Sequence, residues 1–194
     1  MAKKILIIDG HPDRSEERLC HALANAYRGG CDAGDHEVRT IKVSEIDFPL
    51  LRTAEEFDSG QLPTDIRQAQ EGFRWCDHIL IVYPLWLGTM PSLLKGFFEQ
   101  VLRPGFAFDP ESKGWPKGNL AGRSARIVIT MGMPGWVYRW FFGAHSLKSL
   151  ERNILAFAGI KPIRETIYGM VDAASEAKRS KWLSDMQALG RQAR

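Results

Sequence analysis

The chain has 194 residues, of which 44% are hydrophobic and 25% charged, as expected of one globular domain that buries its own core. Its net charge of +3, from 26 basic and 23 acidic residues, is too small and too evenly spread to predict nucleic acid as the main partner. Three widely spaced cysteines, Cys20, Cys31 and Cys76, argue against a disulfide framework and against a C-x-x-C zinc site.

The apolar segments are also too short for a membrane protein. The longest run, residues 79–87, is far shorter than a bilayer requires. Near the N-terminus the apolar stretch covers only residues 5–8 before Asp9 interrupts it, which argues against a signal peptide. We therefore predict a cytoplasmic protein with a single domain, residues 1–194, and with reduced cysteines.

Three short runs are fully apolar and predict strands that are covered on both faces, as in a parallel sheet. They are residues 5–8, 79–83 and 127–130. Two weaker candidates for strands lie at residues 37–43 and 163–170.

Helical patterns separate these strands. Apolar residues recur at helical spacing after Ser15, Thr64, Pro91 and Ser146, and again in residues 182–193. We expect Thr64 to cap its helix.

Five strands alternating with five helices predict a doubly wound, three-layer α/β sandwich. Residues 47–63 and 103–122 are rich in proline, glycine and charge, so they are the predicted insertions. Ligands of such sheets bind beyond the carboxyl ends of the strands.

The loops that follow the three strong strands emerge at one edge of a parallel sheet. They read GHPDRSEERLC, YPLWLGTMP and TMGMPGWVY. Their glycines, prolines and aromatic residues predict a slot for a flat apolar ligand with a polar tail. We expect Trp86, Leu87 and Tyr138 to cover the ring faces, and backbone N–H groups of residues 84–86 and 131–132 to bind ring heteroatoms.

Common nucleotide and hydrolase motifs are absent from the sequence. No G-x-G-x-x-G follows the first strand, which disfavours a dinucleotide-binding Rossmann unit. The chain also has no G-x-x-x-x-G-K-[ST] motif of a P-loop NTPase and no G-x-S-x-G nucleophile elbow of a hydrolase.

The stretch YPLWLGTMPSLLKGFFEQVLRPGFAF resembles a segment of the NAD(P)H:quinone oxidoreductases of the flavodoxin-like superfamily. The residues that match this family's pattern at its spacing are Pro84, Pro91, Leu94, Lys95, Gly96 and Glu99. TMGMPGWVY is similar to the family's Thr-Thr-Gly-Gly loop with its following tyrosine, and GHP to its histidine-bearing phosphate loop. The resemblance covers nearly the whole chain and implies a flavodoxin-like α/β/α sandwich with a five-stranded parallel sheet.

The resemblance also implies a tightly bound flavin, FMN or FAD. The implied cofactor-binding residues are His11, Ser15, Arg18, Leu19 and Cys20 in the first loop, Pro84, Leu85, Trp86 and Leu87 in the second, and Thr130, Met131, Gly132, Met133 and Tyr138 in the third. His11, Arg18 and the helix N-terminus are expected to face the phosphate, with Glu16 and Glu17 pointing outward. Met131 and Met133 replace the family's second threonine and second glycine, which weakens hydrogen bonding from that loop.

The activity that the resemblance implies is NAD(P)H-dependent reduction of a quinone or a related acceptor. NAD(P)H would deliver hydride to flavin N5 and leave, and the acceptor would take its place, giving ping-pong kinetics. Tyr138 and His145 match the family's tyrosine and histidine near the flavin pyrimidine edge, His145 only after a one-residue shift. There they would donate hydrogen bonds or protons to the charge at N1 and O2.

Several residues admit a second interpretation. Phe106 and Phe108 are expected to wall the substrate site, or else to form a dimer contact. His11 and Ser15 can be structural residues of the loop and helix start, and Trp86 and Leu87 can be core. Lys95 and Glu99 predict a structural ion pair.

The aromatic segment at residues 136–145 is either core or a surface for a partner. The resemblance favours a homodimer with the flavin near the interface. Two other functions stay open: a regulatory flavoprotein that binds a membrane potassium-efflux transporter, and a one-electron carrier of the flavodoxin type. A protein whose acidic first loop has abolished flavin binding is a third alternative. The sequence leaves open FMN or FAD, NADH or NADPH, and the physiological acceptor.

Overall fold

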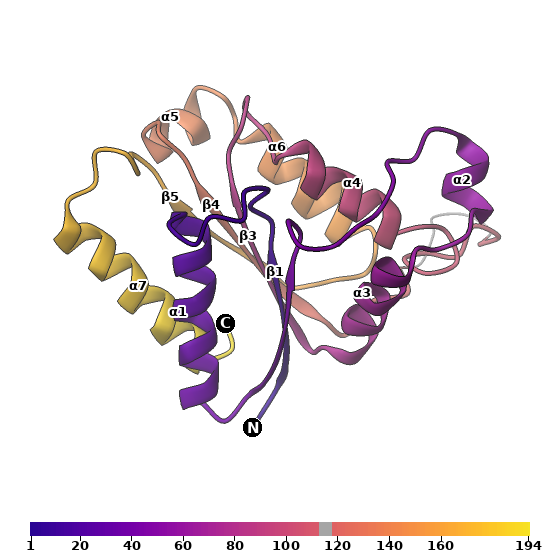
Figure 1. The fold of residues 1–194 in the computed structure, drawn as a ribbon, viewed down its shortest axis with the longest axis horizontal. Helices are drawn as coiled ribbons and strands as arrows, with labels where there is room; N and C mark the ends of the chain where they lie inside the picture. The colour runs from indigo at the N-terminus through magenta and orange to yellow at the C-terminus, as the bar shows by residue number, and fades with distance from the viewer. Residues whose placement is uncertain (113–117) are drawn as a thin grey trace.

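A computed structural model describes residues 1–112 and 118–194 of the protein. Within these residues the fold is built on one five-stranded sheet, in which every pair of neighbouring strands is parallel and the order is β2-β1-β3-β4-β5 (Figure 1). The strands are β1 (Lys4–Asp9), β2 (Glu37–Lys42), β3 (His78–Pro84), β4 (Ser124–Thr130) and β5 (Ile163–Tyr168). All five predicted strands and the parallel sheet are confirmed.

Helices cover both faces of the sheet (Figure 1). One face packs against α1 (Leu19–Ala33) and α7 (Glu176–Arg191), and the other against α3 (Thr64–Trp75), α4 (Ser92–Val101) and the π-helical segment η1 (Ser149–Leu155). Three short helices lie in the described parts of the connections: α2 (Ala54–Ser59), α5 (Gly135–Trp140) and α6 (His145–Lys148), which runs into η1. None of the helices in the described ranges is both long enough and apolar enough to traverse a lipid bilayer.

The two covered faces explain the unalternating apolar runs. Along β1, Ile5 and Ile7 pack with α1 and α7, whereas Leu6 and Ile8 pack with α3 and α4. Because successive side chains of a strand point to opposite faces, both sets must be apolar when both faces are buried.

The structure corrects two predicted helix starts. Thr64 is the first residue of α3 and does not cap it, because the N-cap position belongs to Pro63. Helix α1 begins only at Leu19 with Arg18 as N-cap, so Ser15 does not cap it either. The predicted insertion 47–63 contains α2, whose N-cap Thr53 accepts a hydrogen bond from the Glu56 N–H.

Helices α1 and α7 approach each other through glycine. A Cβ atom on Gly30 would lie 2.0 Å from the Gln187 carbonyl oxygen, and one on Gly190 would lie 2.0 Å from the Tyr27 carbonyl oxygen. This backbone contact holds α7 beside α1.

Candidate functional site

Loops from four strands meet at the carboxyl edge of the sheet and enclose a hollow of about 240 Å³. The strand order changes direction between β1 and β3, which is where open α/β sheets bind ligands. The lining residues are His11, Glu17, Arg18, Leu19, Cys20, Pro84, Thr130, Val171, Asp172 and Arg179. Six of the predicted cofactor residues therefore come together here: His11, Arg18, Leu19, Cys20, Pro84 and Thr130.

His11 is a buried donor at the rim of this hollow. Its Nδ1 accepts a hydrogen bond from the Asp13 N–H at 3.1 Å, so the neutral ring carries its proton on Nε2. Burial, and next the positive charge of His21, lower the pKa of His11, which keeps the ring neutral. The ring also meets the edge of Trp86, with centroids 5.9 Å apart. His11 can thus donate a hydrogen bond to an anion without carrying a charge.

Two of the acidic residues in the first loop, Asp13 and Glu16, pair with basic side chains. The Asp13 carboxylate accepts hydrogen bonds from the Ser15 N–H at 2.9 Å and from Arg18 Nε at 2.7 Å, and these two partners lower its pKa. Glu16 pairs with Lys42 of β2 at 2.7 Å and points away from the hollow, as predicted.

The prediction that Glu17 also points outward is wrong, because Glu17 lines the hollow. Residues 16–18 form a turn and the helix begins later, so Glu16 and Glu17 do not share one outward face. Ser15 lies outside the lining, and the structure brings its N–H, as donor, to Asp13.

The start of α1 adds an anion-binding element. Its N-cap makes no side-chain hydrogen bond, and its first turn contains no acidic residue. The first N–H groups of a helix have no intrahelical partner and carry partial positive charge. Since Leu19 and Cys20 line the hollow, this helix end offers its N–H groups to an anion there.

Three lining residues were missed by the sequence reasoning: Val171, Asp172 and Arg179. They follow β5, which the sequence marked only as a weak strand. Arg179 donates from Nη2 to the Val171 carbonyl at 2.9 Å and adds a second cation beside Arg18. A basic residue in the first turn of the last helix, at the ligand edge of the sheet, was the available signal.

The second loop forms an exposed hairpin turn. Trp86 and Thr89 exchange both backbone hydrogen bonds, and the residues between them, Leu87 and Gly88, have φ of +46° and +80°. The Trp86 side chain is half-exposed and that of Leu87 fully exposed. Assigning them to the core is therefore wrong: both present apolar surface, and the Trp86 ring contacts His11 of the hollow.

The same loop corrects one expectation about ring contacts. The Leu85 N–H donates to the Thr130 carbonyl, and the Trp86 N–H donates to the Thr89 carbonyl, each at 2.8 Å. Pro84 has no N–H. The backbone of residues 84–86 therefore has no donor left for a ring heteroatom.

The third loop is partly buried. Met131 packs into the core and donates its N–H to the Tyr168 carbonyl at 2.9 Å, so neither its side chain nor its N–H is available to a ligand.

Thr130 Oγ1 lies 3.3 Å from Cys20 Sγ and links the end of β4 to α1. Gly132 lies beside Asp172, whose Oδ2 would be 3.0 Å from an added Cβ. Met133 is half-buried against the core.

The two predicted catalytic residues lie outside the hollow. Tyr138 is buried; its hydroxyl lies 2.7 Å from Ser146 Oγ and accepts the Leu147 N–H at 3.1 Å. This hydroxyl joins α5 to α6, and its donation to a ligand stays a prediction. His145, the first residue of α6, is exposed, and its role as a proton donor stays a prediction.

The predicted substrate wall is divided between two environments. Phe106 is core, with the Arg74 guanidinium 4.8 Å from its ring centroid, so its assignment to a substrate pocket is wrong. Phe108 packs against Phe157, with centroids 5.0 Å apart.

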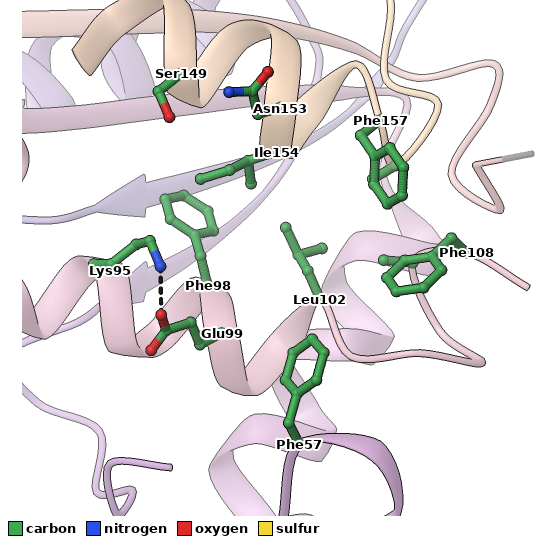
Figure 2. A pocket seen from close by; sticks show the side chains of 12 residues that line it. Phe57, Lys95, Phe98, Glu99, Leu102, Phe108, Ser149, Asn153, Ile154 and Phe157 are labelled. Carbon is green, nitrogen blue, oxygen red and sulfur yellow. Dashed lines mark hydrogen bonds and ion pairs between the residues drawn. The ribbon is translucent and has the colours of Figure 1, made fainter. Parts of the chain in front are cut away.

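Phe108 lines a different cavity, of about 350 Å³, that shares no lining residue with the hollow (Figure 2). Figure 2 shows the phenylalanine rings of this cavity on several elements and the ion pair between Lys95 and Glu99 along α4. The predicted ion pair is thereby confirmed.

A buried ion pair, which the sequence reasoning did not find, lies under the first loop. His21 and Asp9 are each 2% exposed, and His21 Nδ1 lies 2.5 Å from Asp9 Oδ2. Nε2 of His21 lies 2.8 Å from the Asp13 carbonyl oxygen. Since both nitrogens face oxygen acceptors, both carry protons and the ring is an imidazolium.

The surroundings of His21 favour that charge. Burial by itself lowers the pKa of His21, but the hydrogen bonds to Asp9 and to the Asp13 carbonyl, with the charges of Asp9 and Glu16, outweigh burial and raise it. The available signal in the sequence was an acidic residue that ends an apolar strand, followed by a histidine on the buried face of the next helix.

Comparisons with known proteins agree with this architecture. A protein of Haemophilus influenzae named an uncharacterized NAD(P)H oxidoreductase is 29% identical, over 90% of this chain and 87% of its own length. An FMN-dependent NADH:quinone oxidoreductase of Nitratidesulfovibrio vulgaris is 28% identical, over 91% of this chain and 93% of its own. The chain spans only 58–63% of a fungal and two mammalian ribosyldihydronicotinamide dehydrogenase relatives.

Among solved structures, an NAD(P)H:quinone oxidoreductase from Methanothermobacter marburgensis superposes with a TM-score of 0.83 at 21% identity, covering 99% of this chain and 97% of the other. The family model described as the flavodoxin-like fold matches residues 3–189. Sheet order, hollow and sequence agree, and the chain belongs to the family with the flavodoxin-like fold.

Proposed function

We propose that the protein is a flavin-dependent NAD(P)H oxidoreductase that reduces quinones or related acceptors. The observation that carries this proposal is the hollow at the strand ends, where a neutral histidine donor, an uncapped helix N-terminus and two arginines converge. Relatives named as NAD(P)H and quinone oxidoreductases support the same activity.

The residues of the hollow fit the phosphate end of a flavin. His11 Nε2–H and the N–H groups of Leu19 and Cys20 are donors, and Arg18 and Arg179 supply positive charge. Glu17 and Asp172 oppose them, which disfavours a tail with more than one phosphate. This balance and the cofactor in the name of the Nitratidesulfovibrio relative favour FMN.

The ring of the cofactor belongs outside the hollow, next to Trp86 and Leu87. Their exposed apolar surfaces can exclude water from one side of a flat ligand. A bound flavin supplies two-electron exchange between NAD(P)H and the acceptor. The chain would hold the phosphate with His11 and the α1 N-terminus, and His145 is its exposed proton donor near the third loop.

The cofactor and the activity can be tested on the purified protein. We expect bound FMN to give flavin absorption that NADH or NADPH bleaches and that a soluble quinone such as menadione restores. Initial rates with varied NAD(P)H and quinone should give the parallel double-reciprocal lines of ping-pong kinetics. A protein that takes up neither FMN nor FAD would overturn the proposal.

The oligomer that we propose is a homodimer formed through the aromatic surface of Trp136, Trp140, Phe141 and Phe142. Their side chains are 67%, 84%, 81% and 50% exposed. A cluster of this kind is unusual on a monomer and typical of an interface. A second copy is the partner that the resemblance favours, and a membrane protein is the alternative.

A further inference from the structure

Four residues under the first loop form a closed ring of hydrogen bonds. The backbone N–H of His11 donates to Asp9 Oδ1 at 3.3 Å, and the His21 side chain donates from Nδ1 to Asp9 Oδ2 at 2.5 Å. His21 Nε2 donates to the Asp13 carbonyl at 2.8 Å, and the Asp13 N–H returns to His11 Nδ1 at 3.1 Å. The ring joins the end of β1, the loop and the first turn of α1.

His21 is the link between the buried and the exposed part of this ring. One nitrogen of His21 binds the buried carboxylate of Asp9, and the other binds the loop carbonyl whose own amide fixes His11. Asp9 and His21 are almost fully buried, so water does not compete for these bonds. Only a doubly protonated ring can make both donations.

The cycle of hydrogen bonds sets the orientation of the His11 side chain. With its Nδ1 held as an acceptor, the neutral imidazole of His11 carries its proton on Nε2, and none of the hydrogen bonds among the described residues uses this Nε2. The His11 ring contacts the rings of both His21 and Trp86, with centroids 5.4 Å and 5.9 Å away. The orientation of the His11 side chain thus depends on His21 through the backbone of Asp13, and the His11 ring also contacts Trp86.

We propose that His21, paired with Asp9, is the positioning residue that fixes the first loop so that His11 Nε2–H donates to the phosphate of the bound cofactor. This proposal rests on the proposed function for the ligand, but the arrangement of His11 exists without it. His21 does not touch the ligand, since it is absent from the lining of the hollow.

Binding of FMN and riboflavin separates this role from a general loss of structure. The two flavins share their ring and differ in the phosphate, so the ratio of their affinities reports on the phosphate site. We expect His21→Gln, which cannot donate from both ends, to weaken FMN binding about tenfold, equal to about 1.4 kcal/mol. Riboflavin binding should change less than threefold.

Asp9→Asn tests the same link from the other side, because an amide cannot stabilise the imidazolium as a carboxylate does. The matched control is His78→Gln. His78 is also a buried histidine, but it lies at the opposite end of the sheet, where its Nδ1 contacts Ser124 Oγ. This control should leave the ratio of FMN to riboflavin affinity unchanged. Equal losses of both flavins in His21→Gln, or no loss, would overturn the proposal.

The state of the histidines gives a second readout that needs no ligand, and its first part needs no variant. Nitrogen-15 NMR of the wild-type protein without flavin should show both His21 nitrogens protonated and His11 as a single Nε2–H tautomer. In His21→Gln, His11 should become a mixture of tautomers. A mixture already in the wild type, or a neutral His21, would refute the positioning role. If the wild type binds no flavin, the proposed function fails, whereas this measurement still decides the arrangement.

Discussion

At the residue scale, the buried pair of Asp9 and His21 makes stability depend on pH. The titratable groups near the His21 ring are Asp9, His11, Asp13 and Glu16. Burial lowers the pKa of His21, but the hydrogen bonds to Asp9 and to the Asp13 carbonyl and the charges of Asp9 and Glu16 raise it above the ordinary 6.5. A raised folded pKa contributes stability that is fully present below pH 6.5 and is lost as the pH rises through the folded value.

We therefore expect the free energy of unfolding to fall as the pH rises above 6.5, by about 1.4 kcal/mol for each unit of the pKa shift. Urea titrations at a series of pH values measure this slope, and His21→Gln should reduce it. An unchanged slope in that variant would show that His21 does not titrate as described.

The three cysteines should be chemically silent in the folded protein. Cys20, Cys31 and Cys76 are buried, and burial raises the pKa of each thiol to about 12. Because the thiolate is the reactive form, we expect Ellman's reagent at pH 8 to label none of them in the native protein and all three in urea. Rapid labelling of native Cys20 would mean that the contact with Thr130 opens.

Arg179 should contribute to cofactor affinity through charge. We expect Arg179→Gln to weaken FMN binding about tenfold, because a charge-assisted hydrogen bond contributes about 1.5–3 kcal/mol. The effect should shrink as salt is added. Lys181→Gln is the control: it removes an equal charge from the same helix, where Lys181 pairs with Asp185. Isothermal titration should show no difference between the two variants if Arg179 has no such role.

At the element scale, the contact between α1 and α7 depends on the lack of side chains at Gly30 and Gly190. A methyl group at Gly190 would collide with the backbone of Tyr27, so we expect Gly190→Ala to destabilise the fold by about 2 kcal/mol or more. Gly29 lies next to Gly30 on α1 but has no atom within 4 Å of an added Cβ. Gly29→Ala should therefore stabilise the helix by about 0.5–1 kcal/mol. Thermal unfolding of both variants compares them directly, and equal changes would contradict the close approach.

Elements marked by local signals in the sequence were predicted correctly, whereas boundaries that depend on interactions with neighbouring residues were not. Apolar runs at residues 5–8, 79–83 and 127–130 are local signals, and they mark the three central strands correctly. The start of α1 was misplaced because Ser15, a common cap, interacts with Asp13 in a preceding turn.

The candidate site was predictable to the extent that strand ends are. Pro84 and Thr130 are the last residues of apolar strands, His11 lies two residues after one, and all three line the hollow. Arg179 and the pair of Asp9 and His21 depend on contacts between elements, so their signals in the sequence gain meaning only once the elements are placed against one another. The partners of the Tyr138 hydroxyl, Ser146 and Leu147, belong to another helix and were not predictable for the same reason.

At the scale of the whole molecule, the aromatic surface should control assembly. We expect sedimentation to show a dimer for the wild type and a monomer for Trp140→Glu, because a buried charge without a partner opposes association. Leu50→Glu places the same charge on another exposed apolar residue and should leave the dimer intact. A wild type that is already a monomer would favour a different partner for this surface, which pull-down with membranes can detect.

The hollow is lined by residues from the ranges 11–20 and 171–179. These ranges lie far apart in the sequence, which affects how the site forms during synthesis. A ribosome must release the chain beyond Arg179 before the first loop meets the last helix. Until then the apolar face of α1 lacks α7 as its cover and is exposed to chaperones and to aggregation. We expect the cofactor to bind only after translation is complete, as the last step in the formation of the functional protein.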